Sequence, residues 1–487
     1  MIRMKTENLK PAALFGYFEE ICGIPRPSKH EEKMTAYLKA FGESRGLATK
    51  VDEAGNVVIS KPATPGMENR KTIILQSHMD MVCESNKGVN HDFLADPIQL
   101  VIDGEWLKAD GTTLGADNGI GVAAALAVLT DDSIKHGPVE CVFTVDEETG
   151  LTGAMAMQSG FMNGDILLNL DSEDEGELYV GCAGGLDANI AIDYVAEPAA
   201  EGKEALQLSV KGCKGGHSGI QIICQRANAN KLLFRLLRQL SAEMSFDLAA
   251  VDGGGLRNAI PREALATILV EKGSVEAVKA TAKAMEATFV AEFADVEDSI
   301  VVAVESVAMP ESVIPAPTAR NLMAAVVACP NGVDKMSLAM EGLVQTSNNL
   351  ARVVSDGKQI RLQTLIRSSV RSEKEAVGDA IKALFEMAGG CVELSGAYDG
   401  WNPNMQSPIL KAMLSSYEAL YGVRPAIKAI HAGLECGIIS TNYPALDMIS
   451  FGPTIRYPHS PDEKVEIASV EKFYNFLTHT LANAPKK

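Results

Sequence analysis

The sequence predicts an α/β protein in which a mixed sheet with flanking helices is interrupted by an inserted α+β segment. Three observations predict this fold. Short apolar runs alternate with helical segments near both ends of the chain. The middle of the chain instead carries longer amphipathic helices between strands of mixed polarity. The length of 487 residues exceeds that of a single ordinary domain.

In the N-terminal part of the chain, the sequence pattern predicts helices first and buried strands after them. Residues 14–54 have apolar positions three and four apart, which is typical of two amphipathic helices, separated here by Pro25 and Pro27. Apolar runs rich in valine, isoleucine and leucine then indicate buried parallel strands, with one helix after the first strand. In chain order these segments are residues 73–75, 118–130, 140–145 and 165–170.

The inserted segment begins near residue 186. It contains the amphipathic helices 228–244 and 275–293. The α/β pattern resumes with a helix at 408–421, a strand at 446–451 and a helix from residue 467. We therefore predict a first domain made of residues 1–186 and 395–487, and a second domain of residues 187–394. At about 200 residues the second domain is long enough for two subdomains.

Composition excludes several classes of protein. The chain has 44 lysines and arginines against 63 aspartates and glutamates, a net charge of −19 that disfavours nucleic acid or an anionic membrane as a partner. The first ten residues lack the apolar segment of a secretory signal, and no run approaches the roughly 20 apolar residues that span a bilayer. The nine cysteines are scattered without a CxxC pair, as in reduced cytosolic enzymes. We therefore predict a cytoplasmic protein.

Side chains that can bind metals follow several of the predicted strands. Side chains from parallel strands converge outside the carboxyl ends of a sheet, so these residues are expected to meet there. A further acid precedes a helix in the glycine-rich turn 111–121. The candidates are His78, Asp80, Asp117, Glu147, Glu148, Asp171 and His459.

Each candidate also has a simpler interpretation. His78 could be a buried polar residue with ordinary hydrogen-bond partners, and Asp117 could cap the helix that follows it. The adjacent Glu147 and Glu148 could form a solvated loop. Asp171 begins a run of acids that resembles an ordinary surface turn. Only the combination of all these residues favours a metal site.

The combined ligand set has a defined chemistry. Histidine and carboxylate ligands without thiolates suit zinc, manganese or cobalt rather than a structural zinc site. Two divalent cations would balance the charges of Asp117, Glu148, Asp171 and a bridging hydroxide, whereas one cation would leave the acids repelling each other. Glu147 lies next to a ligand and could act as the proton acceptor.

Other motifs do not fit. Gly115, Gly119 and Gly121 lack the spacing of a dinucleotide-binding loop, and no Walker lysine motif is present. Ser218 lies in GGHSG, which is not the GxSxG nucleophile elbow. Nucleotide-binding and serine-hydrolase functions are therefore disfavoured.

The motifs, in their order along the chain, resemble the M20 family of metallopeptidases and most closely its aminoacyl-histidine dipeptidase branch. With the lengths between them, they cover essentially the whole chain. They are HMD from His78, GTTLGADNGIG from Gly111, DEETG from Asp146, NLDSEDEGE from Asn169, GGHSG from Gly215, RNAIPREA from Arg257, HAGLECG from His431 and GPTIRYPHSPDE from Gly452.

The resemblance implies a catalytic domain interrupted by a lid domain, and a role for each candidate. Asp117 would bridge two metals, with a cis peptide bond to Asn118. One metal would also be bound by His78 and Asp171, the other by Glu148 and His459. Asp80 would orient His78, and Glu147 would be the general base that acts on a metal-bridged hydroxide.

In the lid the resemblance implies substrate-binding residues. His217 would reach the developing oxyanion when the domains close, which makes it a third catalytic residue beside Glu147 and Asp80. Arg367 and Asn258 would hold the free carboxylate of a dipeptide, and Glu435 would receive its amino terminus. From sequence alone, His217 could equally be a loop histidine and Arg367 a surface charge.

The sequence thus predicts a cytosolic dipeptidase with two divalent metal ions per chain that hydrolyses Xaa-His and related unblocked dipeptides. Zinc is the expected metal, with cobalt or manganese as alternatives. The predicted partner is a small peptide substrate, and the chain could be a monomer or a homodimer. The alternatives are another M20 hydrolase, either a tripeptidase or an N-acyl amino acid deacylase, and a non-catalytic zinc-binding relative.

Overall fold

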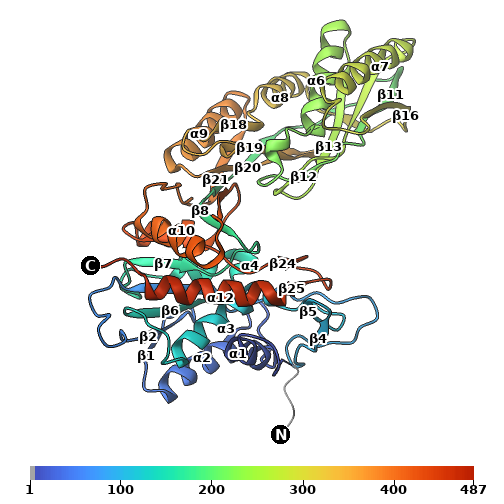
Figure 1. Ribbon diagram of the computed structural model, residues 1–487. Helices are drawn as coiled ribbons and strands as arrows, with labels where there is room; N and C mark the ends of the chain where they lie inside the picture. The colour runs from blue at the N-terminus through green and yellow to red at the C-terminus, as the bar shows by residue number, and fades with distance from the viewer. Residues whose placement is uncertain (1–5) are drawn as a thin grey trace. The chain divides into compact units, whose positions relative to one another are not determined.

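The computed structural model describes residues 6–487, which fold into two compact units (Figure 1). The first unit contains the chain up to Cys182 together with Trp401–Ala429 and Leu434–Lys487. The second contains Ala183–Gly400 and Ile430–Gly433. Each unit combines helices with a sheet, so the predicted α/β class is confirmed. The assignment of catalytic and lid domains, with boundaries at residues 186 and 394 and two lid subdomains, stays a prediction.

The main sheet of the first unit is mixed. Its four central strands are parallel, and antiparallel strands lie on both sides of them. In spatial order the strands are β1 (Ala48–Val51), β2 (Val57–Lys61), β6 (Val139–Thr144), β3 (Ile73–His78), β7 (Ile166–Asn169), β23 (Asp447–Ser450), β8 (Glu177–Cys182) and β22 (Ala426–Ile430). A smaller sheet has the order β24 (Ile455–Arg456), β25 (Lys464–Glu466), β5 (Trp106–Ala109) and β4 (Leu100–Asp103).

The central parallel strands explain how the candidate residues meet. Every residue of β3, β6 and β7 is buried, as expected for parallel strands covered on both faces. Their registers align His78 with Thr144, and Gln76 with Asn169. The carboxyl ends of these strands therefore lie at one edge of the sheet, and the segments that follow them begin side by side.

Helices cover this sheet. Helix α3 (Ala116–Thr130) packs against β3 and β6, and α1 (Ala12–Cys22) and α12 (Ile467–Ala482) pack against α3 (Figure 1). The second helix predicted within residues 14–54 is shorter than expected, because it ends at Ser44 and the chain then forms the mostly exposed strand β1. The helices of this unit are α1 (Ala12–Cys22), α2 (Glu32–Ser44), α3 (Ala116–Thr130), α4 (Glu147–Gly150), α5 (Thr152–Ala156), α10 (Pro408–Tyr421), α11 (Glu435–Asn442) and α12 (Ile467–Ala482).

The second unit is built on a nine-stranded antiparallel sheet. Its spatial order is β16 (Val301–Ser306), β11 (Lys203–Lys211), β15 (Ala264–Glu271), β13 (Asp247–Gly254), β19 (Val344–Ser355), β20 (Gln359–Ser368), β9 (Gly184–Asp193) and β21 (Cys391–Tyr398), and β18 (Gly332–Met336) pairs with β19. Four helices pack against these strands around one apolar core: α6 (Ala229–Glu243), α7 (Val275–Glu292), α8 (Ala316–Ala328) and α9 (Arg371–Met387). The leucines of α6 at positions 232, 233, 236, 237 and 240 are all buried in this core.

Two short ladders and one turn complete this unit. Strands β12 (Gly216–His217) and β14 (Ala259–Ile260) pair with each other, and β10 (Glu197–Pro198) pairs with β17 (Ser312–Val313). A single 3-10 turn covers Ile222–Cys224. The β12–β14 ladder matters for the site because it carries His217.

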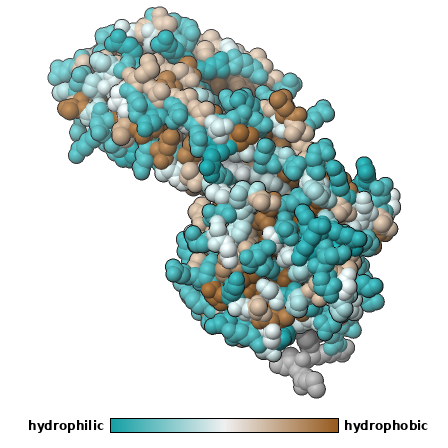
Figure 2. Space-filling view, turned by 90° about the vertical axis from the view of Figure 1, so that its left-hand side faces the viewer, coloured by the Kyte–Doolittle hydropathy of each residue, from teal (hydrophilic) through white to brown (hydrophobic). Residues whose placement is uncertain are grey.

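In Figure 2 hydrophilic residues cover most of the visible face of each unit, with apolar side chains interspersed among them. None of the helices in the described part of the chain combines the length and the apolar character that crossing a membrane requires.

Candidate metal centre

His78 ends β3 and is 1% exposed. Its Nε2 atom lies 3.0 Å from Oδ1 of Asp117 and 3.3 Å from Oδ1 of Asp171. Its Nδ1 atom faces Oδ1 of Asp80 at 3.2 Å. One ring nitrogen therefore points to two candidate ligands, while the other contacts a carboxylate that can fix the orientation and tautomer of the ring.

Asp117 lies between two groups of potential ligands. Its Oδ1 atom faces His78, whereas its Oδ2 atom lies 3.1 Å from Nε2 of His459. The same His459 nitrogen lies 3.0 Å from Oε2 of Glu148. The peptide bond from Asp117 to Asn118 is cis, as the sequence resemblance implied. Two compact ligand triads therefore share one aspartate: His78, Asp117 and Asp171, and Asp117, Glu148 and His459.

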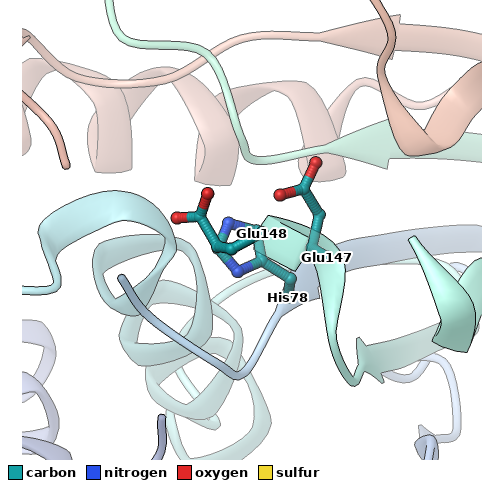
Figure 3. A group of neighbouring side chains, drawn as sticks. All are labelled: His78, Glu147 and Glu148. Atoms are coloured by element: carbon teal, nitrogen blue, oxygen red, sulfur yellow. The ribbon is translucent and has the colours of Figure 1, made fainter. Parts of the chain in front are cut away.

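Asp80 connects the ends of β3 and β6. The side chain is fully buried, and its carboxylate accepts hydrogen bonds from the backbone N–H groups of Glu147 at 3.1 Å and Glu148 at 3.2 Å. Ser28 donates a third hydrogen bond, of 2.8 Å. In Figure 3 the carboxylates of Glu147 and Glu148 point to the same side, and the His78 ring lies beside Glu148. A third compact group, His78, Glu147 and Glu148, places Glu147 next to the ligands.

The acids and histidines shift one another's pKa. Burial would lower the pKa of His78, but the charge of Asp171 and hydrogen bonds to Asp117 and Asp171 raise it well above its usual value. Hydrogen bonds to Asp117 and Glu148 raise the pKa of His459 to about 11. Burial raises the pKa of Asp171 to about 6, and burial together with neighbouring acids also raises that of Glu147. Burial and the concentration of negative charge are therefore the causes of the raised pKa values of Asp171 and Glu147.

The donor set fits divalent cations. Buried acids at this density are ordinarily neutralised by protons or by metal ions. The buried Oε1 atom of Glu148 has no hydrogen-bond partner among the described residues, so it is available to coordinate a metal ion. Two imidazole nitrogens and three carboxylates suit zinc, manganese or cobalt. These residues can therefore hold metal ions.

Glu435 lies in the first unit but is completely buried. Its Oε2 atom accepts hydrogen bonds from Nε2 of Gln76 at 2.6 Å and from Oγ1 of Thr144 at 2.9 Å. Its Oε1 atom has no partner among the described residues. Burial raises the pKa of Glu435 to about 7. Its predicted role, receiving a substrate amino group, stays a prediction and would depend on Oε1.

The other predicted substrate residues belong to the second unit. Two of them, His217 and Arg367, both lie close to Gly219. A Cβ atom at Gly219 would be 3.0 Å from Cε1 of His217 and 3.2 Å from Nε of Arg367. Arg367 lies within β20 and is 6% exposed, with a buried Nε atom that lacks a partner among the described residues. Asn258 is exposed, and its backbone oxygen accepts a hydrogen bond of 2.8 Å from the N–H of Ser218.

The tautomer of His217 follows from its contacts. Its Nδ1 atom accepts hydrogen bonds from the backbone N–H groups of Gly219 at 3.2 Å and Ile220 at 3.1 Å. Burial and the charge of Arg367 lower its pKa, which favours the neutral ring. A neutral ring that accepts at Nδ1 carries its proton on Nε2. His217 therefore presents a hydrogen-bond donor at Nε2.

His431 is a residue that the sequence interpretation quoted in a motif but gave no role. It is 6% exposed, and its Nε2 atom lies 2.7 Å from Oγ of Ser347. Burial and the charge of Arg367 lower its pKa to about 3, so its ring is neutral. The only feature of the sequence that pointed to His431 was its place as the first residue of the motif HAGLECG. Two further residues were given no role, Arg26 and also Glu463, which ends the motif GPTIRYPHSPDE. Both contact the segments that carry the candidate ligands.

Comparisons with known proteins agree on one family. The model of peptidase family M20/M25/M40 matches residues 74–483. A protein of Escherichia coli (strain K12) named cytosol non-specific dipeptidase is 44% identical over 482 residues, covering 99% of each chain. The crystal structure of an aminoacylhistidine dipeptidase from Vibrio alginolyticus is 45% identical with a TM-score of 0.95, covering 100% of this chain and 99% of that one. The aminopeptidase PepT of Bacillus cereus shares the fold, with a TM-score of 0.58, 16% identity and coverage of 98% and 99%.

Proposed function

The chain belongs to peptidase family M20/M25/M40, and from that premise we propose that it is a cytosolic metallodipeptidase that hydrolyses Xaa-His and related unblocked dipeptides. The observation that carries the proposal is the pair of ligand triads sharing Asp117. Both solved and curated relatives of nearly equal length bear dipeptidase names. The cytosolic location follows the name of the Escherichia coli relative.

The proposed metals are two zinc ions, one in each triad, with cobalt or manganese as alternatives. Bound there, they would polarise the scissile carbonyl group and lower the pKa of the attacking water. Asp80 orients His78 through its Nδ1 atom, at 3.2 Å, and fixes the backbone of both glutamates. Glu147, held beside the ligands by this contact, takes a proton from the attacking water and returns it to the leaving amine.

Three of the residues proposed to contact the substrate belong to the second unit, and Glu435 belongs to the first. The Nε2–H group of His217 donates to the oxygen that becomes negative in the transition state. Arg367 pairs with the free carboxylate of the dipeptide, for which its unpartnered Nε atom is suited. Asn258 assists Arg367, and Glu435 receives the substrate amino group. Recognition of both charged ends restricts the substrate to short peptides, because a longer chain would leave one of these groups without a partner.

A substrate panel tests the proposal. Zinc-reconstituted protein is expected to hydrolyse Xaa-His dipeptides, to act much more slowly on tripeptides and N-acyl amino acids, and to lose activity in EDTA. Hydrolysis is measured by release of free histidine. Preference for a tripeptide or an N-acyl amino acid would replace the proposal with another activity of the same family. Absence of both bound metal and hydrolysis would favour a non-catalytic relative.

Replacing Arg367 with alanine is expected to raise KM for free dipeptides by about 10–100-fold, the equivalent of ~1.5–3 kcal/mol for a hydrogen bond to a charged group. The value of kcat should change less, since the carboxylate lies away from the reacting bond. The matched control is a dipeptide amide, which lacks the carboxylate. If the variant loses as much kcat/KM on the amide as on the free dipeptide, Arg367 does not bind the carboxylate.

A further inference from the structure

Glu463 makes an unusual set of contacts with the segment that carries Asp117. It is 2% exposed and lies four positions after His459 in the sequence. Its Oε2 atom accepts hydrogen bonds from the backbone N–H groups of Leu114 at 2.7 Å and Gly115 at 2.8 Å. Its Oε1 atom accepts from those of Ala116 at 2.8 Å and Asp117 at 3.2 Å. One carboxylate thus binds four consecutive N–H groups at the start of α3.

These four N–H groups need such a partner. The first N–H groups of a helix have no acceptor within the helix, and the positive end of the helix dipole favours a carboxylate there. Leaving a buried donor without an acceptor costs ~1–3 kcal/mol. The contacts also join the segment of His459 to the segment of Asp117, and both residues are predicted ligands. Glu463 lies four residues after His459, and its oxygens accept hydrogen bonds from the backbone as far as the N–H group of Asp117.

Arg26 makes the corresponding contacts with the segment after β3. It is 2% exposed, and its Nη1 atom donates to the backbone oxygens of Met79 at 3.1 Å and Asp80 at 2.8 Å. Its Nη2 atom donates to the backbone oxygen of Gly115 at 2.6 Å. A Cβ atom on Gly115 would lie 2.5 Å from Nη2, so glycine makes room for the guanidinium group. Arg26 therefore joins the HMD segment to the segment that Glu463 holds.

We propose that Glu463 and Arg26 are positioning residues that hold the His78, Asp117 and His459 segments in their ligating arrangement independently of bound metal. Neither residue needs to contact an ion, because both act through backbone groups. This proposal rests on the proposed metal site. It explains how Asp117 stays beside His78 and His459 before cations arrive, because Glu463 and Arg26 both hold the backbone of the segment that carries it.

The test is the affinity of the full-length apoprotein for zinc, measured by competition with a chromophoric chelator. Glu463→Gln keeps the size of the side chain but turns an amide NH2 group toward two N–H donors. Its zinc affinity is expected to fall about 10–100-fold, the usual effect of losing an outer-sphere partner of a metal site. Glu463→Asp keeps both acceptor oxygens and should recover part of this loss.

The matched control is Glu140→Gln, at the opposite end of β6. Glu140 is also buried, at 8% exposure, and its Oε2 atom accepts a backbone hydrogen bond of 2.7 Å from Asn163. The control is expected to lower Tm but to keep wild-type zinc affinity. If both variants lose the same affinity, or if Glu463→Gln loses only Tm, the positioning role is wrong.

A second variant covers the case in which Glu463→Gln does not fold. Arg26→Lys keeps the positive charge but cannot reproduce the planar three-bond contact, so it should weaken zinc binding in the same direction. Unchanged zinc affinity in Arg26→Lys would overturn the role of Arg26. Failure of the wild-type protein to bind zinc would instead overturn the proposed metal site, so the two proposals fail separately.

Discussion

Replacing Glu147 with alanine is expected to lower kcat for dipeptide hydrolysis by about 10²–10⁴-fold, the usual contribution of a general base, while the protein still binds its metals. Glu147 is not a member of either triad that shares Asp117, so its removal leaves those ligands in place. Its backbone N–H group, which binds Asp80, is also kept. Turnover is measured with saturating zinc, and metal content by elemental analysis of the same sample.

Asp174→Ala is the matched control for Glu147→Ala. Asp174 is an acid of the turn that follows Asp171, and its side chain is 44% exposed and paired with Arg456. This control should keep wild-type turnover. Near-normal hydrolysis by Glu147→Ala would rule out its assignment as the base. Loss of metal from Glu147→Ala would instead make Glu147 a ligand.

The fold was predictable where the pattern of the sequence is strongest. The apolar runs that became β3, β6 and β7 are buried on both faces, and such strands produce continuous apolar stretches. The strand β1 was not predicted, because ATKV is mostly exposed and carries no apolar alternation that could separate it from the preceding helix. Strand order within the sheet depends on contacts between distant segments, which local periodicity does not contain.

The candidate ligands were predictable because each follows an element that the sequence reveals. The convergence rule for parallel strands predicts that His78, Glu148 and Asp171 meet, and in the structure Glu148 and Asp171 each belong to a compact group with His78. His459 was a candidate for the same reason, although it lies nine residues beyond β23, and the family resemblance then implied its role as a ligand. Their roles as ligands of specific metals remain predictions.

Residues that act through backbone contacts could not be found in this way. Arg26 looks like a charge between two prolines, and Glu463 looks like one of many surface acids. Their partners are 89 and 346 positions away, as in Arg26 with Gly115 and Glu463 with Asp117. The only sequence signal for Glu463 was its place in the motif GPTIRYPHSPDE. Burial of a charged side chain becomes visible only when the fold is known.

The largest effect on metal binding is expected from Asp117→Asn. Each carboxylate oxygen of Asp117 faces a different histidine, at 3.0 Å for His78 and 3.1 Å for His459, so the residue belongs to both triads. The amide keeps the shape of the side chain but removes its negative charge and one acceptor. We expect zinc affinity at both sites to fall by more than the roughly 10–100-fold that an outer-sphere change causes, and hydrolysis to be lost with it.

A comparison with His459→Ala makes the prediction for Asp117→Asn specific. His459 belongs to one triad only, so its removal should leave the His78, Asp117 and Asp171 group able to bind one ion. Zinc titration monitored by calorimetry should therefore give two bound ions per chain for the wild-type protein and one for His459→Ala. Asp117→Asn should bind no ion tightly. Two ions bound to Asp117→Asn at wild-type affinity would show that this aspartate does not bridge them. All three proteins keep Glu147, Asp80 and Glu463, so the differences in stoichiometry report only on whether the changed ligand belongs to one triad or to both.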